Sequence, residues 1–349
     1  MNDPGGGSAI ESTSVVGREK WRVWAFVALC VAAVAGAGAY TRMALHRDAR
    51  AATAPSDRGR LSAEPARPFL MVRSTASDDT WRRLVLAPLS SPDDAAYTTP
   101  LECDRAYFAA NRGVCLVDER SGIVMNHYAD IFDERFSRLH RVTLTGLASR
   151  TRVSPDGRYA GITVFESGHS YSDGAFSTKT TVIDTSSGEV RGDLEQFRIV
   201  RDGQTFRAVD FNFWGVTFAQ DSNRFYVTLA SGGTNYLVEG DLRAREGRVI
   251  RSGVECPSLS PDNTRIAYKQ MLDSPGKWQL HVLDLRSGSD LPLTVETRSV
   301  DDQVDWLDND HVMYHLSGAR GTDIWVLGTD NSEPPRLLRH SSYSPAVIR

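Results

Sequence analysis

The side chains best suited to chemistry form an acidic run near residue 300. The run consists of Asp301, Asp302, Asp305, Asp308 and Asp310. Carboxylate oxygens are the ligands that Ca²⁺ prefers, so a calcium site is one interpretation. The run lacks the D-x-[DN]-x-[DN]-G loop, however, and alternate residues of a strand point to opposite faces. We therefore expect these aspartates to shape turns, and we predict no metal ion or other cofactor.

A catalytic nucleophile or a zinc site is not indicated either. The nearest approach to the G-x-S-x-G nucleophile motif is the segment 168–172 (GHSYS), which ends in serine and has no strand-to-helix elbow around it. The eight histidines are scattered and show no H-E-x-x-H spacing. An enzyme that assembles its site from distant segments stays open as an alternative.

The four cysteines match no C-x-x-C redox or metal pattern. Cys103 and Cys115 could belong to one hairpin that turns near residues 111–113. In that register the residue opposite Cys115 falls near Phe108, several residues from Cys103. The sequence therefore argues against a disulfide between them.

The bulk composition is that of a soluble globular protein. With 349 residues, 41% of them hydrophobic and 24% charged, the chain can bury a substantial core. Its net charge is −4 and it has no basic stripe, which argues against a nucleic-acid partner. The length exceeds that of one ordinary domain, so a repeat architecture or non-globular segments are expected.

One apolar segment is long enough to cross a membrane. Residues 23–40 carry no charge and have basic residues on both sides. We predict a transmembrane helix over residues 21–41, after an N-terminal tail of residues 1–20 and before a flexible linker of residues 42–68. A cleavable signal peptide is the alternative, because residues 37–39 fit the small-x-small pattern of a cleavage site.

Beyond residue 68 a unit of one turn and one strand recurs. The turn at residues 154–157 (SPDG) precedes RYAGITVF, and the turn at residues 260–263 (SPDN) precedes TRIAYKQ. Weaker copies begin at Ala219 and Leu307, and each first strand is followed by a second run that ends near Asp or Gly. No window holds a sustained apolar stripe of period 3.6, which excludes a helical repeat.

Two further strand pairs lack the Ser-Pro-Asp signature, and counting the first strand of each pair gives six units. They start near residues 69, 105, 158, 224, 265 and 311. Residues 69–349 then divide into units of about 47 residues, the size of a four-stranded propeller blade. We predict an all-β, six-bladed β-propeller over residues 69–349.

The Ser-Pro-Asp-Gly turn and the strand after it resemble the repeat of TolB-like β-propellers, with the best copies at residues 154–165 and 260–270. The resemblance covers residues 69–349 and extends to the TolB-like membrane proteins of actinobacteria. It implies a propeller outside the cytoplasm, attached to the cell membrane by a single span. A count of basic residues around the apolar segment slightly favours a propeller in the cytoplasm, which is the alternative orientation.

Propeller connectivity sorts the loops onto two faces. The Ser-Pro-Asp turns lie on one, which we call the turn face, and the long insertions at residues 166–177 and 195–211 share the other, which we call the loop face. The second insertion contains a hairpin signal at Asp202-Gly203. The first strand pair lacks an inner strand, which residues 341–349 could supply to close the ring. Because the chain enters at Phe69 on the turn face, we expect the linker to hold that face toward the membrane.

Inner strands begin on the loop face, so residues about six positions before each turn aspartate should line the channel mouth there. With neighbouring and loop residues they form the predicted binding site. Its members are Arg150, Arg152, His169, Tyr171, Asp210, Asn212, Trp214, Glu255, Asp301 and Asp302. A ligand or peptide site is one interpretation, and charged side chains that only solvate the mouth are the other.

Together these patterns favour a membrane-anchored, monomeric and non-catalytic binding module of the cell envelope. Its expected partner is an envelope protein or a cell-wall-derived ligand. The alternative is a propeller hydrolase or lyase that acts on a carbohydrate or lactone in the central channel, with Glu255, Asp301 and Asp302 as its carboxylates.

Overall fold

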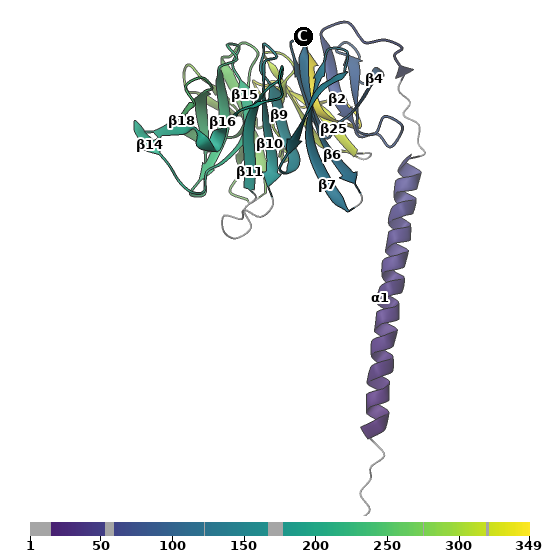
Figure 1. Cartoon of the computed structure of the whole chain (residues 1–349). Coiled ribbons are helices and arrows are strands. Elements are labelled where there is room, and N and C mark those ends of the chain that lie inside the picture. The colour runs from purple at the N-terminus through teal and green to yellow at the C-terminus, as the bar shows by residue number, and fades with distance from the viewer. Residues whose placement is uncertain (1–14, 53–58, 122, 167–176, 275, 319–320) are drawn as a thin grey trace, which may run out of the picture. The chain divides into compact units, whose positions relative to one another are not determined.

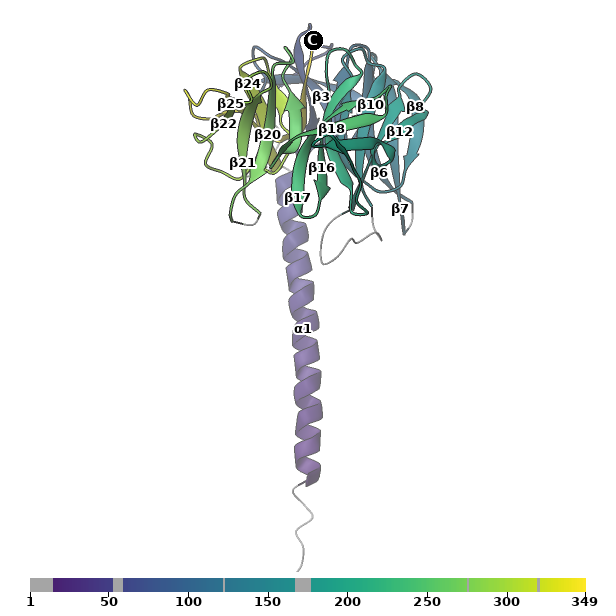
Figure 2. The same cartoon turned by 90° about the vertical axis from the view of Figure 1, so that its left-hand side faces the viewer.

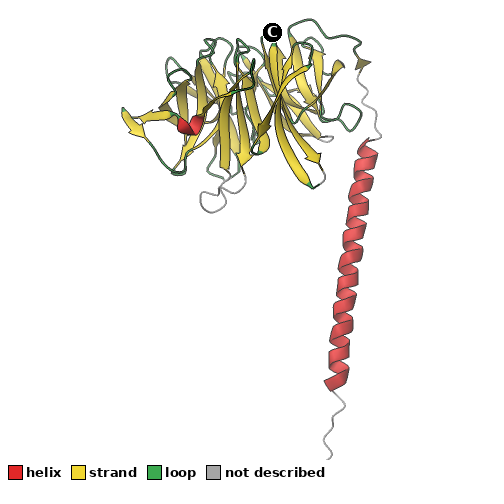
Figure 3. Ribbon diagram, viewed as in Figure 1, coloured by secondary structure: helices red, strands yellow, loops and turns green. Residues whose placement is uncertain are grey.

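The computed structural model describes residues 15–52, 59–121, 123–166, 177–274, 276–318 and 321–349. The chain divides into two compact units, one that ends at Pro55 and one that begins at Ser56. The first contains the helix α1 (Val15–Ala52). The second contains the strands and one short 3-10 helix, η1 (Leu194–Gln196) (Figure 3).

The helix α1 contains the apolar segment found in the sequence. Val23–Tyr40 has a mean hydropathy of 2.0 over 18 residues and is long and apolar enough to cross a membrane. The helix continues to Ala52, into the range predicted to be a flexible linker. The alanines and arginines of that range favour helix, which accounts for the difference.

The second unit is a six-bladed β-propeller, which confirms the predicted fold class (Figures 1 and 2). From the channel outward, blade 1 contains β27 (Ser342–Ile348), β2 (Phe69–Ser74), β3 (Arg83–Pro88), β4 (Ala95–Glu102) and β1 (Gly59–Arg60). In the same direction, blade 2 contains β5 (Arg105–Ala109), β6 (Arg112–Ser121), β7 (Val124–Asp133) and β8 (Arg138–Leu144). Blade 3 contains β9 (Leu147–Val153), β10 (Tyr159–Glu166), β11 (Ser177–Asp184) and β12 (Val190–Asp193).

The other half of the ring has the same order. Blade 4 contains β15 (Asn212–Phe218), β16 (Arg224–Ser231), β17 (Thr234–Asp241), β18 (Glu246–Ser252), β13 (Arg198–Arg201) and β14 (Gln204–Phe206). Blade 5 contains β19 (Glu255–Leu259), β20 (Arg265–Met271), β21 (Trp278–Asp284) and β22 (Asp290–Pro292). Blade 6 contains β23 (Asp305–Trp306), β24 (His311–Gly318), β25 (Gly321–Gly328) and β26 (Arg336–Arg339).

The C-terminal strand closes the ring. β27 is the inner strand of blade 1 and pairs antiparallel with β2, with Phe69 opposite Ile348 and Ser74 opposite Ser342. This confirms that residues 341–349 supply the inner strand missing before Phe69. Closure leaves no open sheet edge between the first and last blades, where another chain could pair.

Of two local features predicted from the sequence, one agrees with the structure and the other does not. The predicted hairpin at Asp202-Gly203 is confirmed, because β13 and β14 pair with Arg201 opposite Gln204 and both turn residues have positive φ. β13 then adds to β18 in parallel and extends blade 4 to six strands. By contrast, the unit counted from residue 105 begins one strand earlier than the others, since β5 is an inner strand.

The chain also joins the propeller earlier than residue 69. Gly59 pairs with Ala95 at the outer edge of blade 1, and Arg60 Nη2 donates to Asp79 Oδ1 at 2.5 Å. Asp79 lies in the turn between β2 and β3, a connection between second and third strands that belongs to the loop face. The segment that leads from α1 is therefore attached along the outer edge of blade 1, at the start of β4, and the Arg60 side chain reaches the β2–β3 turn.

The Ser-Pro-Asp turns are held by their own side chains. In the turn from β9 to β10, Ser154 Oγ donates to Asp156 Oδ1 at 2.6 Å and accepts from Tyr159 N at 2.9 Å. Asp156 Oδ1 also accepts from Arg158 N at 3.0 Å. Gly157 follows with φ of +77°, a conformation that favours glycine.

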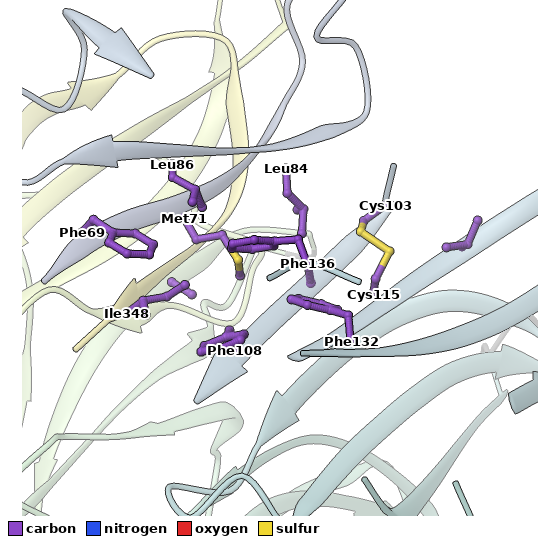
Figure 4. Close-up of a cluster of buried hydrophobic side chains, with 13 residues drawn as sticks. Phe69, Met71, Leu84, Leu86, Cys103, Phe108, Cys115, Phe132, Phe136 and Ile348 are labelled. Atoms are coloured by element: carbon purple, nitrogen blue, oxygen red, sulfur yellow. A yellow bond between two sulfur atoms is a disulfide. The ribbon is translucent and has the colours of Figure 1, made fainter. Parts of the chain in front are cut away.

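The core lies between neighbouring blades, and the cluster between blades 1 and 2 includes a disulfide (Figure 4). Cys103 and Cys115 are bonded, with their Cα atoms 5.3 Å apart, so the expectation of no disulfide is wrong. The hairpin turns at Ala110-Asn111, which places Ala106 opposite Cys115, and Cys103 lies in the crossing from blade 1 that folds back against β6. The spacing of residues in the hairpin does not reveal that the crossing from blade 1 folds back against β6.

Candidate functional site

The inner strands of all six blades converge on a cavity at the turn face. Its volume is about 370 Å³. One lining residue from each blade is Ile348, Tyr107, Arg152, Phe218, Leu259 and Trp306. The wall is therefore mixed, with aromatic and aliphatic surface interrupted by a few charged and polar groups, as is common in ligand pockets.

The charged groups of this cavity are Arg152 and Asp305. Arg152 Nη2 donates to Val304 O at 2.9 Å and lies 4.0 Å from Asp305 Oδ1, while its guanidinium stacks 4.6 Å from the Tyr107 ring centre. Burial raises the pKa of the Asp305 carboxyl, and Arg152 opposes this only in part. The cavity thus offers a fixed cation and a carboxyl group against an aromatic wall.

A second charged cluster occupies the channel nearer the loop face. Asp302, which is 2% exposed, lies 3.1 Å from Arg105 Nη2, 4.0 Å from Arg150 Nη2 and 2.6 Å from His315 Nδ1. Burial alone would raise the pKa of Asp302, but Arg105, His315 and Arg150 hold it well below the usual value. Tyr343 of β27 lies under the Arg105 guanidinium at 4.1 Å. This carboxylate is locked as an anion between cations.

The other two predicted carboxylates share one lysine. Lys269 Nζ is hydrogen-bonded to Asp301 and lies 3.8 Å from Glu255 Oε2. Trp278 Nε1 donates to Glu255 Oε1 at 3.3 Å. Lys269 is itself buried, so the group is an ion cluster in the channel wall. Each of the two carboxylates therefore has a cationic partner.

The structure separates the predicted site residues into several environments. Arg150 and Asp302 are in contact distance, and Glu255 and Asp301 meet through Lys269, whereas Arg152 points to the cavity at the opposite end of the channel. The remaining members behave as follows. Trp214 is buried, Asp210 accepts from Ser231 Oγ and Gly232 N, Asn212 accepts from Thr178 N, and His169 and Tyr171 lie outside the described residues.

Sequence reasoning missed Tyr107, Asp305 and Trp306 as lining residues of the cavity. It counted back six positions from each turn aspartate and so reached the loop-face end of each inner strand. The residues just before the turns mark the opposite end of the same strands, and they line the cavity. That signal was present in the turn motif itself.

One buried acceptor in the channel has no protein partner among the described residues. Gln303 Nε2 donates to Pro257 O at 2.7 Å and to Val216 O at 3.2 Å, which bridges blades 4 and 5. Gln303 Oε1 is the acceptor that lacks a hydrogen bond to any of those residues. A buried polar atom of this kind is usually satisfied by ordered water or by a ligand. Within the same part of the chain, no group of three or more His, Cys, Asp and Glu side chains is arranged to hold a metal ion.

Comparisons with known proteins give the fold. No protein-family model and no curated protein match the sequence. TolB from Acinetobacter baumannii matches with a TM-score of 0.58 and 16% identity over 80% of this chain and 66% of that chain. A chain of the nidogen/laminin complex matches with a TM-score of 0.53 and 10% identity, over 80% of this chain and 97% of that one.

A putative TolB from Agrobacterium tumefaciens has a TM-score of 0.46 and 12% identity, over 78% of this chain and 88% of that one. This chain spans just under two thirds of the length of the Acinetobacter TolB. The fold is thus a TolB-like six-bladed propeller, as the repeat implied.

Proposed function

We propose that this protein is a membrane-anchored, non-catalytic binding module of the cell envelope, and that its central channel holds a segment of an envelope protein or a cell-wall-derived ligand. The observation that carries the proposal is the turn-face cavity, which has an aromatic wall with Arg152 and Asp305 fixed in it. Such a wall can bind a short chain that carries both polar groups and apolar side chains. Gln303 Oε1, deeper in the channel and without a partner among the described residues, supports the same interpretation.

The pairing of the channel carboxylates favours binding over hydrolysis. A general acid and base need carboxyl groups whose protonation can change during the reaction. Asp302 is held as an anion by Arg105, Arg150 and His315, and Glu255 and Asp301 contact Lys269. A hydrolase or lyase built on these three carboxylates would first have to break those contacts.

A photo-crosslinking residue placed at Gln220 tests the proposal in the native host. Gln220 is exposed and lines the cavity, while Asp202, at the tip of the β13–β14 hairpin, provides a matched exposed control. We expect an adduct with a defined envelope protein or glycan at residue 220 and none at residue 202. Equal labelling at both positions, or none at either, would contradict a cavity ligand.

A conservative change in the cavity separates ligand contact from damage to the fold. Arg152→Lys keeps the positive charge but loses the planar guanidinium that stacks on Tyr107. We expect the adduct yield at residue 220 to fall while the melting temperature changes little. An unchanged yield would show that the ligand does not contact this wall.

The Cys103–Cys115 disulfide supports a propeller outside the cytoplasm. Structural disulfides persist in oxidising compartments and are rare in the bacterial cytoplasm. In cells quenched with a thiol-alkylating reagent, both cysteines should stay unmodified until a reductant is added. If they are alkylated without reductant, the propeller faces the cytoplasm, which is the orientation that the basic-residue count slightly favours.

A further inference from the structure

Apolar side chains project from three hairpin turns of the loop face. The β6–β7 turn of blade 2 carries Ile123, which is 103% exposed, followed by Val124 and Met125. The β2–β3 turn of blade 1 carries Trp81, 51% exposed, and the β20–β21 turn of blade 5 carries Met271 and Leu272. Turns between strands normally hold small or polar residues, so these side chains are unusual for their position. We call Ile123, Val124 and Met125 the blade 2 tip.

The blade 2 tip stands clear of the sheet that carries it. β6 and β7 pair as far as Ser121 opposite Val124, but β7 and β8 begin to pair only at His127 opposite Leu144. The last turn of the hairpin is therefore a two-stranded ribbon with no neighbour on that side. Figures 1 and 2 show it extending away from the end of the propeller where the C-terminus lies.

The same arrangement recurs in blade 5. Met271 pairs with Trp278 beyond the last partners of β20 and β21 in the neighbouring strands, which are Glu255 and Pro292. The equivalent turns of the opposite face are polar, as at residues 155–157 and 261–263. The apolar side chains are thus concentrated on one face, whereas exposed hydrophobic residues scattered singly would need no explanation.

Basic side chains accompany each apolar turn. Arg120 pairs with Met125 across the ribbon, Arg83 follows Trp81 closely, and Lys277 precedes Trp278 in blade 5. Two of the nearby acidic groups are already paired, Glu119 with Arg141 at 2.8 Å and Asp79 with Arg60 at 2.5 Å. The acidic neighbours outside these two pairs include Asp78, in the turn that carries Trp81, and Asp273 in blade 5. Apolar and basic groups together fit the surface of a bilayer that contains anionic lipid.

The covalent connection to the membrane segment brings a bilayer within reach. Eighteen residues, 41 to 58, separate Tyr40 from Gly59, so even a fully extended chain would span only roughly 60 Å. The chain first meets the propeller at the outer edge of blade 1, where Gly59 pairs with Ala95, and Arg60 contacts Asp79 in the turn that carries Trp81. Tethering makes a second membrane contact intramolecular, so weak contacts suffice.

From these observations we infer that the loop face docks on a lipid bilayer, with Trp81, the blade 2 tip and Leu272 inserted among the headgroups and upper acyl chains. The three turns stand on separate blades, so a fluid apolar surface suits them better than one peptide. When the loop face docks on the bilayer, the turn-face cavity is directed away from the membrane. It is the opposite of the orientation expected from the entry of the chain at Phe69, and the contact of Arg60 with the turn that carries Trp81 favours it.

Fluorescence quenching in vesicles tests this inference. The full-length chain with Cys30→Ser, which removes the exposed free cysteine, would carry a single environment-sensitive label through Val124→Cys. Asn309→Cys, in an exposed turn of the opposite face, is the matched control. The vesicles would contain phosphatidylcholine with a minor fraction of phosphatidylglycerol and a lipid that carries a nitroxide on its acyl chain.

We expect the nitroxide lipid to quench the label at residue 124 several-fold more than the label at residue 309. Adding Trp81→Ser and Leu272→Ser should reduce quenching at residue 124 with only a small change in the melting temperature, because both side chains are about half exposed. Equal, weak quenching at the two positions would overturn the inference. So would shielding of residue 124 that appears only when envelope proteins are added, since the loop face would then belong to a protein partner.

Discussion

The two faces of the propeller use their turns for different purposes. On the turn face, Ser154 and Asp156 direct their hydrogen-bonding groups to the backbone and side chains of their own turn, and the same holds for Asp262 with Thr264 N. On the loop face, Ile123 is fully exposed and Trp81, which stacks against Arg73, is half exposed. Turn-face residues therefore stabilise the fold, whereas loop-face tips contribute little to it and are available for contact with something else.

Removal of the closing strand should have the largest effect, because β27 runs through the channel between the two faces. Deletion of residues 341–349 removes the partner of β2 and uncovers Phe69 and Met71. We expect a loss of about 5 kcal/mol or more, comparable to the whole stability of a domain. A truncated chain that stays monomeric with an unchanged melting temperature would refute the role of this strand. Arg349→Ala, which leaves β27 intact, is the control.

Within the loop-face half of the channel, buried and exposed carboxylates should differ sharply. Asp302→Asn leaves Arg105 and Arg150 as largely buried cations without their counter-ion, and we expect it to cost about 3–5 kcal/mol. Asp301→Asn, at a side chain that is 54% exposed, should cost less than about 1 kcal/mol. Chemical denaturation of both variants measures the difference. Similar losses would mean that the two carboxylates have the same environment.

Lowering the pH should remove the stability that Asp302 contributes to the fold. The folded-state pKa of Asp302 lies below its unfolded value, so its contribution is present above the ordinary aspartate pKa and is lost as the pH falls below it. The variant Asp302→Asn should therefore show a shallower loss of stability on acidification than the unmodified protein. A steeper loss would contradict the ion cluster.

The smallest effects should come from the turns themselves. Asp156→Ala removes an acceptor from Arg158 N and should cost about 1 kcal/mol, while Val124→Ser in the blade 2 tip should stay within about 0.5 kcal/mol. Burial raises the pKa of Asp156, but hydrogen bonds from Ser154 and Arg158 lower it overall, so its contribution also fades at acid pH. Thermal melts of both variants would measure the difference in stability loss between the turn face and the loop face. A larger loss at Val124 would reverse the comparison.

The sequence was sufficient for the fold because each blade repeats a local signal. The Ser-Pro-Asp turns and the β-branched runs after them depend on residues close together in the chain, and so do the hairpin at Asp202-Gly203 and the apolar window Val23–Tyr40. The need for ring closure then predicted β27. Such features are set by backbone preference and strand periodicity, which a sequence displays directly.

The candidate site and the disulfide depended on contacts that no local pattern contains. Arg105 and Asp302 are 197 residues apart in the sequence yet share a hydrogen bond in the channel, and Arg152 of blade 3 meets Asp305 of blade 6. Cys103 reaches Cys115 only because the crossing between blades folds back. The sequence by itself determined the number of blades, the Ser-Pro-Asp turns and the strands that follow them. The closed ring decided which side chains meet, because packing six blades around one axis brings together residues that no spacing rule relates.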